Sequence, residues 1–405
     1  MFHGATGHQQ VLKDINRMTL LRLLFAKPGL SRSALAAEAQ LTKSTVSLLV
    51  NELMAEGWLQ EHEVIASGEL GRRPTPLFVD PHRLLLLGAE LGIEGVEVVI
   101  TSLTGKVVAS LVASYGPDTQ AATCIQLLAR SLLKVLEQVD LGRQKIIGIG
   151  IGLPGGVNED SECLIFAPNL GWRDVAFGAA LRGELCASVL AGTPLFLQNE
   201  ADVAALGESE FNPSEKADPL LYVSISHGVG AGVLVGDRLL TGYRGFAGEV
   251  GHIILQWEGP LCTCGRKGCA EALIGFRAML GGNKPDPQRP EATNQLAEIQ
   301  RRIREADPIT MQSVDQAGRY LGVLLQNLTA AYDPARIVLG GAATNLGAVY
   351  LAPALATLYG YAKSAGLPQP SVKVSSFGSS AVAVGGAGMV RYRLTRPLLG
   401  KVREI

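Results

Sequence analysis

One histidine and three cysteines lie close together in the order His-x9-Cys-x-Cys-x4-Cys: His252, Cys262, Cys264 and Cys269. One imidazole and three thiolates match the tetrahedral coordination and the ligand preference of zinc. Glycines in the same stretch allow the loop to fold tightly enough for the sulfur atoms to converge. Three ordinary buried cysteines are the alternative, which this density and spacing disfavour. Because all four tetrahedral positions are filled, the motif predicts one structural zinc ion per chain rather than a catalytic one.

The composition limits the class of protein. Hydrophobic residues make up 47% of the 405 residues and charged residues 18%, which excludes an intrinsically disordered chain. The length predicts two or three domains. The 36 basic and 37 acidic residues nearly balance, so the net charge indicates no particular partner. Glycine accounts for 48 of the 405 residues, which is more than its ordinary share of about 7%. This excess indicates tight turns or backbone that passes close to a ligand.

Neither a secretory signal nor a membrane span is apparent in the sequence. The N-terminal stretch lacks the apolar segment of a signal peptide, and no run approaches the ~20 apolar residues needed to cross a bilayer. Six cysteines could form three disulfides, but the size of the chain and the lack of a secretion signal disfavour this. We therefore expect a cytoplasmic protein without membrane insertion.

The first eighty residues predict a separate helical unit. Apolar residues recur at three- and four-residue steps from Val11 to Phe25, and Pro28 with the following glycine ends that helix. Ser31 and Thr42 are good N-caps for two further helices, and each is flanked by apolar residues spaced as a hydrophobic staple. Two short capped helices joined by a tight turn describe a helix-turn-helix.

The third of these helices has an apolar stripe and an opposite polar face. Its stripe consists of Val46, Leu49, Val50 and Leu53. The outward side chains are small or hydrogen-bonding, which suits a helix whose N-terminus enters the major groove of DNA. A solvated face on a small helical domain is the alternative interpretation. The DNA-contacting residues expected from these two helices are Arg32, Thr42, Lys43, Ser44, Thr45 and Ser47.

A hairpin wing is expected after the third helix. Residues 68–74 read Gly-Glu-Leu-Gly-Arg-Arg-Pro between two β-like runs, and Arg72 and Arg73 would reach phosphate or the minor groove. A helix-turn-helix with a wing favours DNA binding over a merely solvated surface. Gln40 departs from the usual pattern, because the tight turn between the helices normally holds glycine. A non-glycine residue in a left-handed conformation costs about 1 kcal/mol.

The order of charges within this unit predicts a basic face. Residues 13–43 hold six basic and two acidic side chains, whereas residues 52–69 hold five acids and no base. One basic and one acidic face fit this order, and a phosphate backbone would select the basic face.

Beyond residue 81 the pattern changes to strands that alternate with helices. A helical segment is expected near residues 123–139. The expected strands are residues 84–91, 96–102, 106–114 and 146–153. Strand-then-glycine signals also appear at residues 224–232, 337–341 and 381–388. This repetition predicts an α/β fold with ligand-facing loops.

The cysteine motif and the N-terminal helix-turn-helix together resemble those of one known family, and the resemblance covers essentially the whole chain. The chain resembles the ROK family (repressors, open reading frames, kinases), and within it the winged-helix transcriptional regulators of the NagC/Mlc/XylR group. The resemblance implies a two-lobed, actin-like ATPase fold of the sugar-kinase type after the winged helix. The implied domains are a DNA-binding domain at 1–80, a first α/β lobe at 81–197 plus 383–405, and a second lobe with the sugar and zinc sites at 198–382.

The resemblance also implies a sugar site. The family's Asn-Asp pair corresponds here to Asn199-Glu200, its Gly-Glu-x-Gly-His to residues 248–252, and its Gly-Cys-x-Glu to residues 268–271. His252 would face sugar with one ring nitrogen and zinc with the other. Carboxylates and amides suit paired hydroxyls, and Trp172 is expected to help shape the pocket. The implied sugar-binding residues are Gly155, Gly156, Asn169, Asn199, Glu200, Glu249, His252 and Glu271.

Three departures from the kinases of the family argue against phosphoryl transfer. The position of the catalytic base holds Glu200 instead of aspartate, and the longer side chain displaces the carboxylate. The two phosphate loops carry Glu94 and His227 where the kinases have threonine. We therefore expect no catalytic residue, and an ATP-dependent sugar kinase is the alternative.

The expected function is a sugar-responsive transcriptional regulator, a repressor of carbohydrate uptake or catabolism genes that a monosaccharide releases. The expected partners are an operator in double-stranded DNA, the sugar, and further copies of the chain in a homodimer or homotetramer. Control by a protein partner, as for one glucose regulator of the family, is a further alternative. The Asn199-Glu200 pair resembles the xylose-repressor branch and favours direct sugar sensing.

Overall fold

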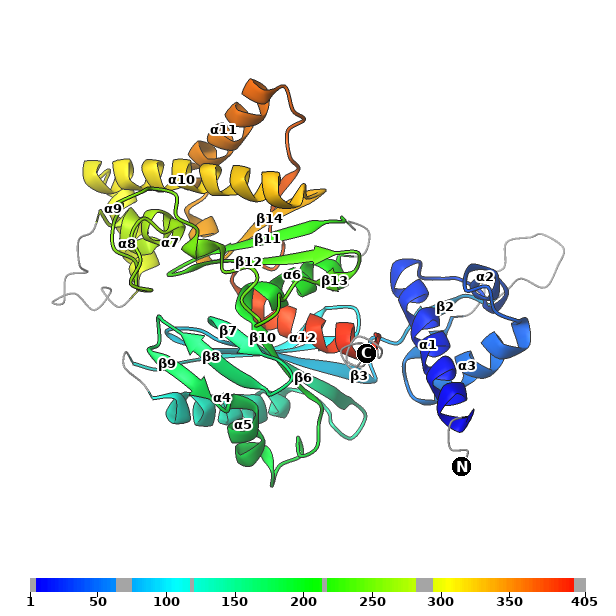
Figure 1. The fold of residues 1–405 in the computed structure, drawn as a ribbon. Coiled ribbons are helices and arrows are strands. Elements are labelled where there is room, and N and C mark those ends of the chain that lie inside the picture. The colour runs from blue at the N-terminus through cyan, green and yellow to red at the C-terminus, as the bar shows by residue number, and fades with distance from the viewer. Residues whose placement is uncertain (1–4, 63–74, 117–119, 213–216, 282–293, 397–405) are drawn as a thin grey trace.

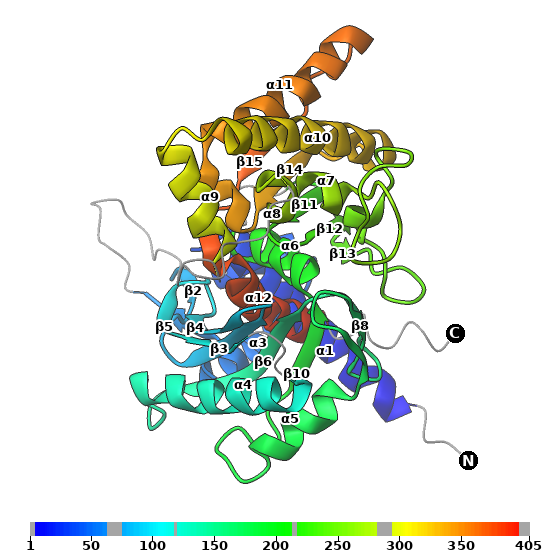
Figure 2. The same ribbon diagram turned by 90° about the vertical axis from the view of Figure 1, so that its left-hand side faces the viewer.

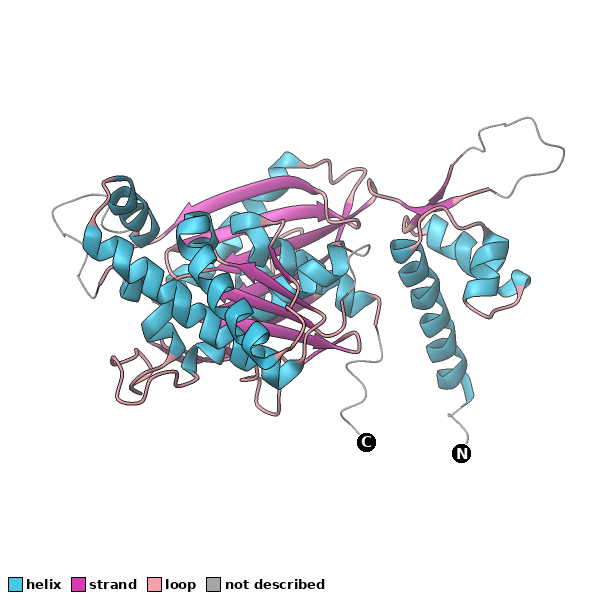
Figure 3. Ribbon diagram, turned by 90° about the horizontal axis from the view of Figure 1, so that it is seen from above, coloured by secondary structure: helices cyan, strands magenta, loops and turns pink. Residues whose placement is uncertain are grey.

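The structure, a computed structural model, describes residues 5–62, 75–116, 120–212, 217–281 and 294–396. A small N-terminal unit lies to one side of two lobes that are each built on a five-stranded sheet (Figure 1). Two helices, α6 (Glu200–Phe211) and α12 (Ala381–Leu394), lie between the sheets. The view from above shows the long helix α1 beside, rather than within, the two lobes (Figure 3).

The N-terminal unit contains the three predicted helices: α1 (Ala5–Ala26), α2 (Arg32–Glu38) and α3 (Lys43–Ala55). Both predicted N-caps are confirmed, because the Ser31 and Thr42 hydroxyls each accept a hydrogen bond from a backbone N–H three residues later, at 3.2 Å. The four stripe residues of α3 are all buried, as predicted. Strands β1 (Leu59–Glu61) and β2 (Leu77–Val79) pair in antiparallel fashion after α3.

Gln40 adopts the left-handed conformation that the sequence predicted, with φ of 54°. The backbone N–H of Leu41 donates to the carbonyl of Ala36 at 3.0 Å across this turn, which ends α2 and turns the chain toward α3. Glycine would adopt this backbone without strain, so Gln40 is a locally unfavourable residue that the packing of the two helices maintains.

The first lobe is built on a sheet with the strand order β10-β6-β3-β4-β5. Its strands are β3 (Leu84–Leu91), β4 (Gly95–Ser102), β5 (Val107–Ser114), β6 (Lys145–Leu153) and β10 (Leu195–Asn199). Helices α4 (Ala121–Val135) and α5 (Phe177–Leu185) cover its outer face, and η1 (Leu136–Gln138) extends α4. A small second sheet contains β7 (Gly156–Asn158), β8 (Cys163–Ala167) and β9 (Trp172–Val175). The expected crossing between lobes at residues 197 and 198 falls within β10.

The second lobe has the strand order β13-β12-β11-β14-β15. Its strands are β11 (Leu220–Ile225), β12 (Val229–Val235), β13 (Arg238–Leu239), β14 (Arg336–Gly340) and β15 (Val372–Val374). The long helix α10 (Pro308–Tyr332) packs with α11 (Ala348–Ala365) over this sheet. The shorter helices are η3 (Val250–His252), α7 (Ala270–Ile274), α8 (Phe276–Met279), α9 (Gln295–Arg304), η5 (Ala342–Leu346) and η6 (Gly378–Ser380).

The strand signal predicted at residues 381–388 is wrong, because this segment forms the first half of α12. Its glycines serve close helix packing instead of a strand-to-loop turn. A Cβ on Gly207 of α6 would lie 2.8 Å from the Cα of Gly385, and one on Gly388 would lie 3.0 Å from the Cα of Gly207. The two helices therefore touch backbone to backbone, and Figure 2 shows them lying together between the lobes.

The N-terminal unit shares its hydrophobic core with the first lobe. Leu20 and Leu24 of α1 belong to one buried cluster with Leu84 and Leu86 of β3 and with Val390 of α12. Because side chains alternate between the faces of a strand, the neighbouring leucines of β3 point into the core of the first lobe instead. The winged helix is therefore packed against the lobes through apolar contacts.

Candidate functional site

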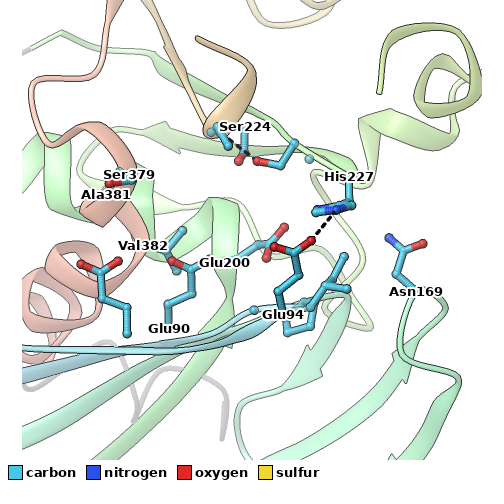
Figure 4. A pocket seen from close by; sticks show the side chains of 18 of the residues that line it. Glu90, Glu94, Asn169, Glu200, Ser224, His227, Ser379, Ala381 and Val382 are labelled. Atoms are coloured by element: carbon cyan, nitrogen blue, oxygen red, sulfur yellow. Dashed lines mark hydrogen bonds and ion pairs between the residues drawn. The ribbon is translucent and has the colours of Figure 1, made fainter. Parts of the chain in front are cut away.

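A cavity of about 380 Å³ lies between the two lobes, where the first residues of α6 and α12 meet the turn between β11 and β12. Figure 4 shows Glu90, Glu200 and His227 around it. Seven of the eight residues expected to contact sugar line this one cavity: Gly155, Asn169, Asn199, Glu200, Glu249, His252 and Glu271. Residues from five separate stretches of sequence are thus brought together.

The other two expected contributors do not line the cavity. Gly156 is the first residue of β7, and a Cβ there would overlap the ring of Phe246. Trp172 lies in β9 and is buried in the core of the first lobe, because its indole packs inward as an apolar residue. The expectation that Trp172 shapes the pocket is therefore wrong.

Asn199 is held firmly at the start of α6. Its Oδ1 accepts hydrogen bonds from the backbone N–H groups of Ala201 and Asp202, at 2.8 and 3.4 Å, as an N-cap residue does. Its Nδ2 donates to the carbonyl of Gly155 at 3.0 Å, which ties α6 to the loop after β6. One amide hydrogen of Asn199 is left to donate to a ligand in the cavity.

The cavity is rich in carboxyl groups, and burial raises the pKa of three of them. Burial, with the nearby Glu249, raises the pKa of Glu200 to about 7. Burial likewise raises the pKa of Glu249 and, well above its usual range, that of Glu90. Carboxyl groups near their pKa can both donate and accept hydrogen bonds, as sugar hydroxyls do. No lysine or arginine is among the described residues that line this cavity.

A cross-cleft contact occupies the region of the two predicted phosphate loops. His227 Nε2 of the second lobe lies 3.3 Å from Glu94 Oε1 of the first lobe, as the dashed line in Figure 4 shows. Nearby, the Ser380 hydroxyl donates to Glu97 at 2.5 Å. Sequence reasoning did not single out Glu97 or Ser380, because neither lies in a recognisable motif.

The predicted metal ligands converge beside this cavity, which His252 also lines. One ligand atom from each of His252, Cys262, Cys264 and Cys269 lies within 4.8 Å of all the others. The Sγ atoms of Cys264 and Cys269 are 3.7 Å apart, and His252 Nδ1 is 3.7 Å from Cys262 Sγ. Two sulfurs bound tetrahedrally to one zinc at ~2.3 Å would lie about 3.8 Å apart, so this geometry fits the metal.

The two ring nitrogens of His252 face different neighbours. Nδ1 faces the cysteine cluster, whereas Nε2 lies 3.9 Å from Glu249 Oε2 on the cavity side. The ring therefore stands between the metal-type cluster and the carboxyl-lined cavity. A metal bound by Nδ1 would fix the orientation of this ring.

The face of α3 has the exposure expected of a DNA-contacting helix. Thr42, Lys43 and Ser44 are exposed, and Thr45 and Ser47 are half-buried. The Thr42 hydroxyl is engaged as the N-cap, so its first role is structural. The predicted wing residues Arg72 and Arg73 lie outside the described residues, between β1 and β2.

The prediction of a continuous basic face is wrong. Lys13 lies 2.7 Å from Glu52, Lys27 lies 2.8 Å from Glu38, and Arg17 pairs with Glu52 and Glu56. The acidic residues at the C-terminal end of α3 thus lie against the basic residues of α1. Of the six basic residues at 13–43, only Lys43 has no ion pair within the described ranges.

Arg32 is likewise fixed within the unit. Its guanidinium donates to Glu61 at 3.0 Å and to Asn51 at 2.8 Å. These bonds hold the N-terminus of α2 against α3 and β1. Arg32 would have to leave them to reach a phosphate, so Lys43 is the better-placed cation.

None of the helices in the described part of the chain combines the length and apolar character needed to span a membrane.

Comparisons with known proteins agree with this architecture. The xylose repressor of Bacillus subtilis (strain 168) is 30% identical over 333 residues, which cover 82% of this chain and 83% of the repressor. A solved ROK family transcriptional regulator, a homologue of the E. coli MLC protein, has a TM-score of 0.75 at 23% identity and covers 96% of this chain and 98% of its own.

A kinase is also similar to the lobes alone. A ROK family glucokinase from Streptomyces griseus, solved with glucose and AMPPNP, has a TM-score of 0.64 at 25% identity and covers 76% of this chain and 99% of its own. The winged helix-turn-helix DNA-binding family matches residues 13–60, and the ROK family matches residues 86–393. Because the second match spans most of the chain, this protein belongs to the ROK family, with a winged helix-turn-helix ahead of its ROK domain.

Proposed function

We propose that this protein is a transcriptional repressor that binds operator DNA through its winged helix and releases it when a monosaccharide enters the interlobe cavity. The observation that carries the proposal is the joining, in one chain, of a helix-turn-helix with an exposed polar helix α3 to a cavity lined by glutamates, asparagines and a histidine. The similarity to a xylose repressor supports it and makes D-xylose the first sugar to test.

The sugar would be held by groups from both lobes. Asn199 and Glu200 would bind it from the start of α6, with Gly155 and Asn169 on the same side. Glu249, His252 and Glu271 would bind from the opposite wall. A ligand that bridges two lobes binds a closed arrangement better than an open one, which is the differential affinity that a conformational change requires.

A structural zinc ion would belong to this function. His252, Cys262, Cys264 and Cys269 would hold it, and the ion would fix the loop that carries His252 and leads to Glu271. All four ligands come from the protein, so the ion would shape the sugar site without taking part in a reaction.

For DNA, the first turn of α3 is the proposed reading element. Lys43 would contact phosphate, and Ser44, Thr45 and Ser47 would face base edges from a major groove. Two such helices in a homodimer would meet successive half-sites of a palindromic operator, and a tetramer would extend the same arrangement.

Sugar phosphorylation is the second candidate, and the similarity to the glucokinase is the observation that favours it. The charges in the cavity oppose it. Glu90, Glu94 and Glu200 would face the triphosphate of ATP, and the described lining offers no lysine or arginine to offset them. The contact between His227 and Glu94 occupies the same region.

An electrophoretic mobility assay separates these functions. A duplex selected for binding from a random library would be titrated with the protein at fixed salt, with and without D-xylose, D-glucose or N-acetyl-D-glucosamine. We expect one sugar to weaken binding at least five-fold, in the range of ordinary allosteric coupling. DNA binding that none of these sugars alters would refute the sensor. ADP release with sugar and ATP at a rate of about 1 per second or more would establish the kinase instead.

A further inference from the structure

Helices α6 and α12 both run from the cavity to the DNA-binding unit. Glu200 is the first residue of α6, and Ala381 and Val382 open α12; all three line the cavity (Figure 4). The 12 residues of α6 span about 18 Å. At the other end, Arg391 in the last turn of α12 lies against Phe25 of α1 and against Phe211, the last residue of α6.

The two helices are packed so closely that neither can move alone. Gly207 of α6 faces Gly385 and Gly388 of α12 at backbone contact distance, with no side chain between them that could change rotamer to absorb a shift. Interfaces of this kind move as rigid bodies because protein interiors have few voids. A displacement of Glu200 or Val382 at the cavity is therefore passed along both helices together.

At the far end, Arg391 of α12 joins three elements in a buried cluster. It is 3% exposed. Its Nε donates to Glu210 of α6 at 2.8 Å, and its Nη1 donates to the carbonyl of Leu103 at 2.9 Å. Its guanidinium lies 4.2 Å from the ring centroid of Phe25 in α1 and 4.7 Å from that of Phe211 in α6. The planar group is thus sandwiched between the DNA-binding unit and α6.

A second contact ties α1 to the same cluster. Asp237, in the turn between β12 and β13, accepts hydrogen bonds from Arg396 at 2.7 and 3.0 Å and pairs with Arg22 of α1. Arg396 also lies 2.9 Å from Glu210. The second lobe, both central helices and α1 are therefore connected through one charged network.

We infer that α6 and α12 form a rigid two-helix connection between the sugar cavity and the winged helix, and that Arg391 is the positioning residue that transmits their movement to α1. The inference rests on the proposed function, because it concerns how sugar binding reaches DNA. It assigns to Arg391, Arg22 and Phe25 a role in coupling rather than in binding either ligand.

The test measures coupling separately from binding. The Arg391→Lys variant keeps the positive charge but loses the planar fork that lies between two rings and reaches both Glu210 and Leu103. The matched control is Arg319→Lys, which changes an exposed arginine of α10 that pairs with Asp315. For each protein, titration gives the affinity for D-xylose alone, for the selected DNA alone, and for DNA with saturating D-xylose.

We expect Arg391→Lys to keep both separate affinities within about three-fold of the unaltered protein, while the factor by which D-xylose weakens DNA binding falls toward one. In Arg319→Lys, D-xylose should weaken DNA binding by the same factor as in the unaltered protein. If Arg391→Lys does not fold, Arg22→Ala is the second variant. It removes the contact to Asp237, and the Arg22 side chain is 43% exposed. The factor by which D-xylose weakens DNA binding should fall in this variant as well.

The outcomes that would overturn the inference differ from those that overturn the proposed function. A full coupling factor in both Arg391→Lys and Arg22→Ala refutes the two-helix connection while the sensor stands. Arg391→Lys could instead lower sugar affinity, DNA affinity and thermal stability equally, while D-xylose still weakens DNA binding by the full factor. That result would assign Arg391 a structural role only. An unaltered protein whose DNA affinity is changed by none of D-xylose, D-glucose and N-acetyl-D-glucosamine refutes the proposed function, and the inference falls with it.

Discussion

Replacing Gln40 by glycine should stabilise the helix-turn-helix, although the substitution removes a side chain. Gln40 is exposed, with φ of 54°, so few contacts are lost and backbone strain is relieved. A non-glycine residue in this conformation costs about 1–2 kcal/mol, whereas glycine loses about 0.5–1 kcal/mol more backbone entropy on folding. The expected net gain is about 0.5–1 kcal/mol in the free energy of local opening.

The neighbouring residue provides a control of opposite sign. Ala39 caps α2 in a right-handed conformation, with φ of −81°, so glycine there relieves no strain and only adds unfolded-state entropy. Ala39→Gly should therefore lower the free energy of opening by about 0.5–1 kcal/mol. Gln40→Ala keeps the backbone strain, so the free energy of opening should be unchanged.

Native-state hydrogen exchange of the full chain, read on peptides that cover α2 and α3, measures this local free energy. The amide of Leu41, which donates to Ala36 across the turn, is the most direct reporter. Gln40→Gly should slow exchange roughly two- to five-fold and Ala39→Gly should accelerate it by a similar factor. Faster exchange in both variants would refute the assignment of strain to Gln40.

Three further predictions concern the cavity, the metal cluster and the wing. Because burial raises the pKa of Glu200 from the ordinary 4.5 to about 7, ionisation should strengthen sugar binding from about pH 6 to about pH 8 in the unaltered protein. The free energy of unfolding should fall between about pH 4.5 and about pH 7 and then level off. Isothermal titration should show no such strengthening of sugar binding in Glu200→Gln. Metal analysis should find about one zinc per chain in the unaltered protein and much less in Cys264→Ser. The thermal midpoint of Cys264→Ser should be lower, and a chelator should no longer change it. The double change Arg72→Ala and Arg73→Ala should weaken binding to all DNA sequences and reduce the salt slope by about two, so an unchanged slope would exclude the wing from phosphate contact.

Local features of the fold could be predicted well from the sequence. The caps at Ser31 and Thr42 and the stripe of α3 depend on residues a few positions apart, and all are confirmed. The strand at Leu84–Leu91 has the predicted bounds, because its apolar run begins directly after Arg83 and glycine follows Leu91. The grouping of one histidine and three cysteines was also predictable, because these residues lie within one short stretch of sequence.

Contacts between distant segments were not predictable in the same way. Arg391 and Glu210 are separated by 181 positions, and nothing in the sequence around either indicates a buried ion pair. The acidic residues at the C-terminal end of α3 were assigned to a separate face because sequence order does not show that α1 packs beside α3. The glycines of α12 resembled a strand-to-loop signal because close helix contact and tight turns both favour glycine.

Leu84 and Leu86 belong to the same buried cluster as Leu20 and Leu24, so the winged helix closes part of the apolar surface beside β3. A ROK domain excised at residue 81 would present part of that surface to water and would be expected to self-associate at concentrations where the full chain stays dispersed. The winged helix is therefore packed against the ROK domain and is not merely tethered to it. A kinase of the family without a winged helix should carry a polar side chain at the position of Leu84, whereas the position of Val390, which also packs against Gly148 of β6, should stay apolar.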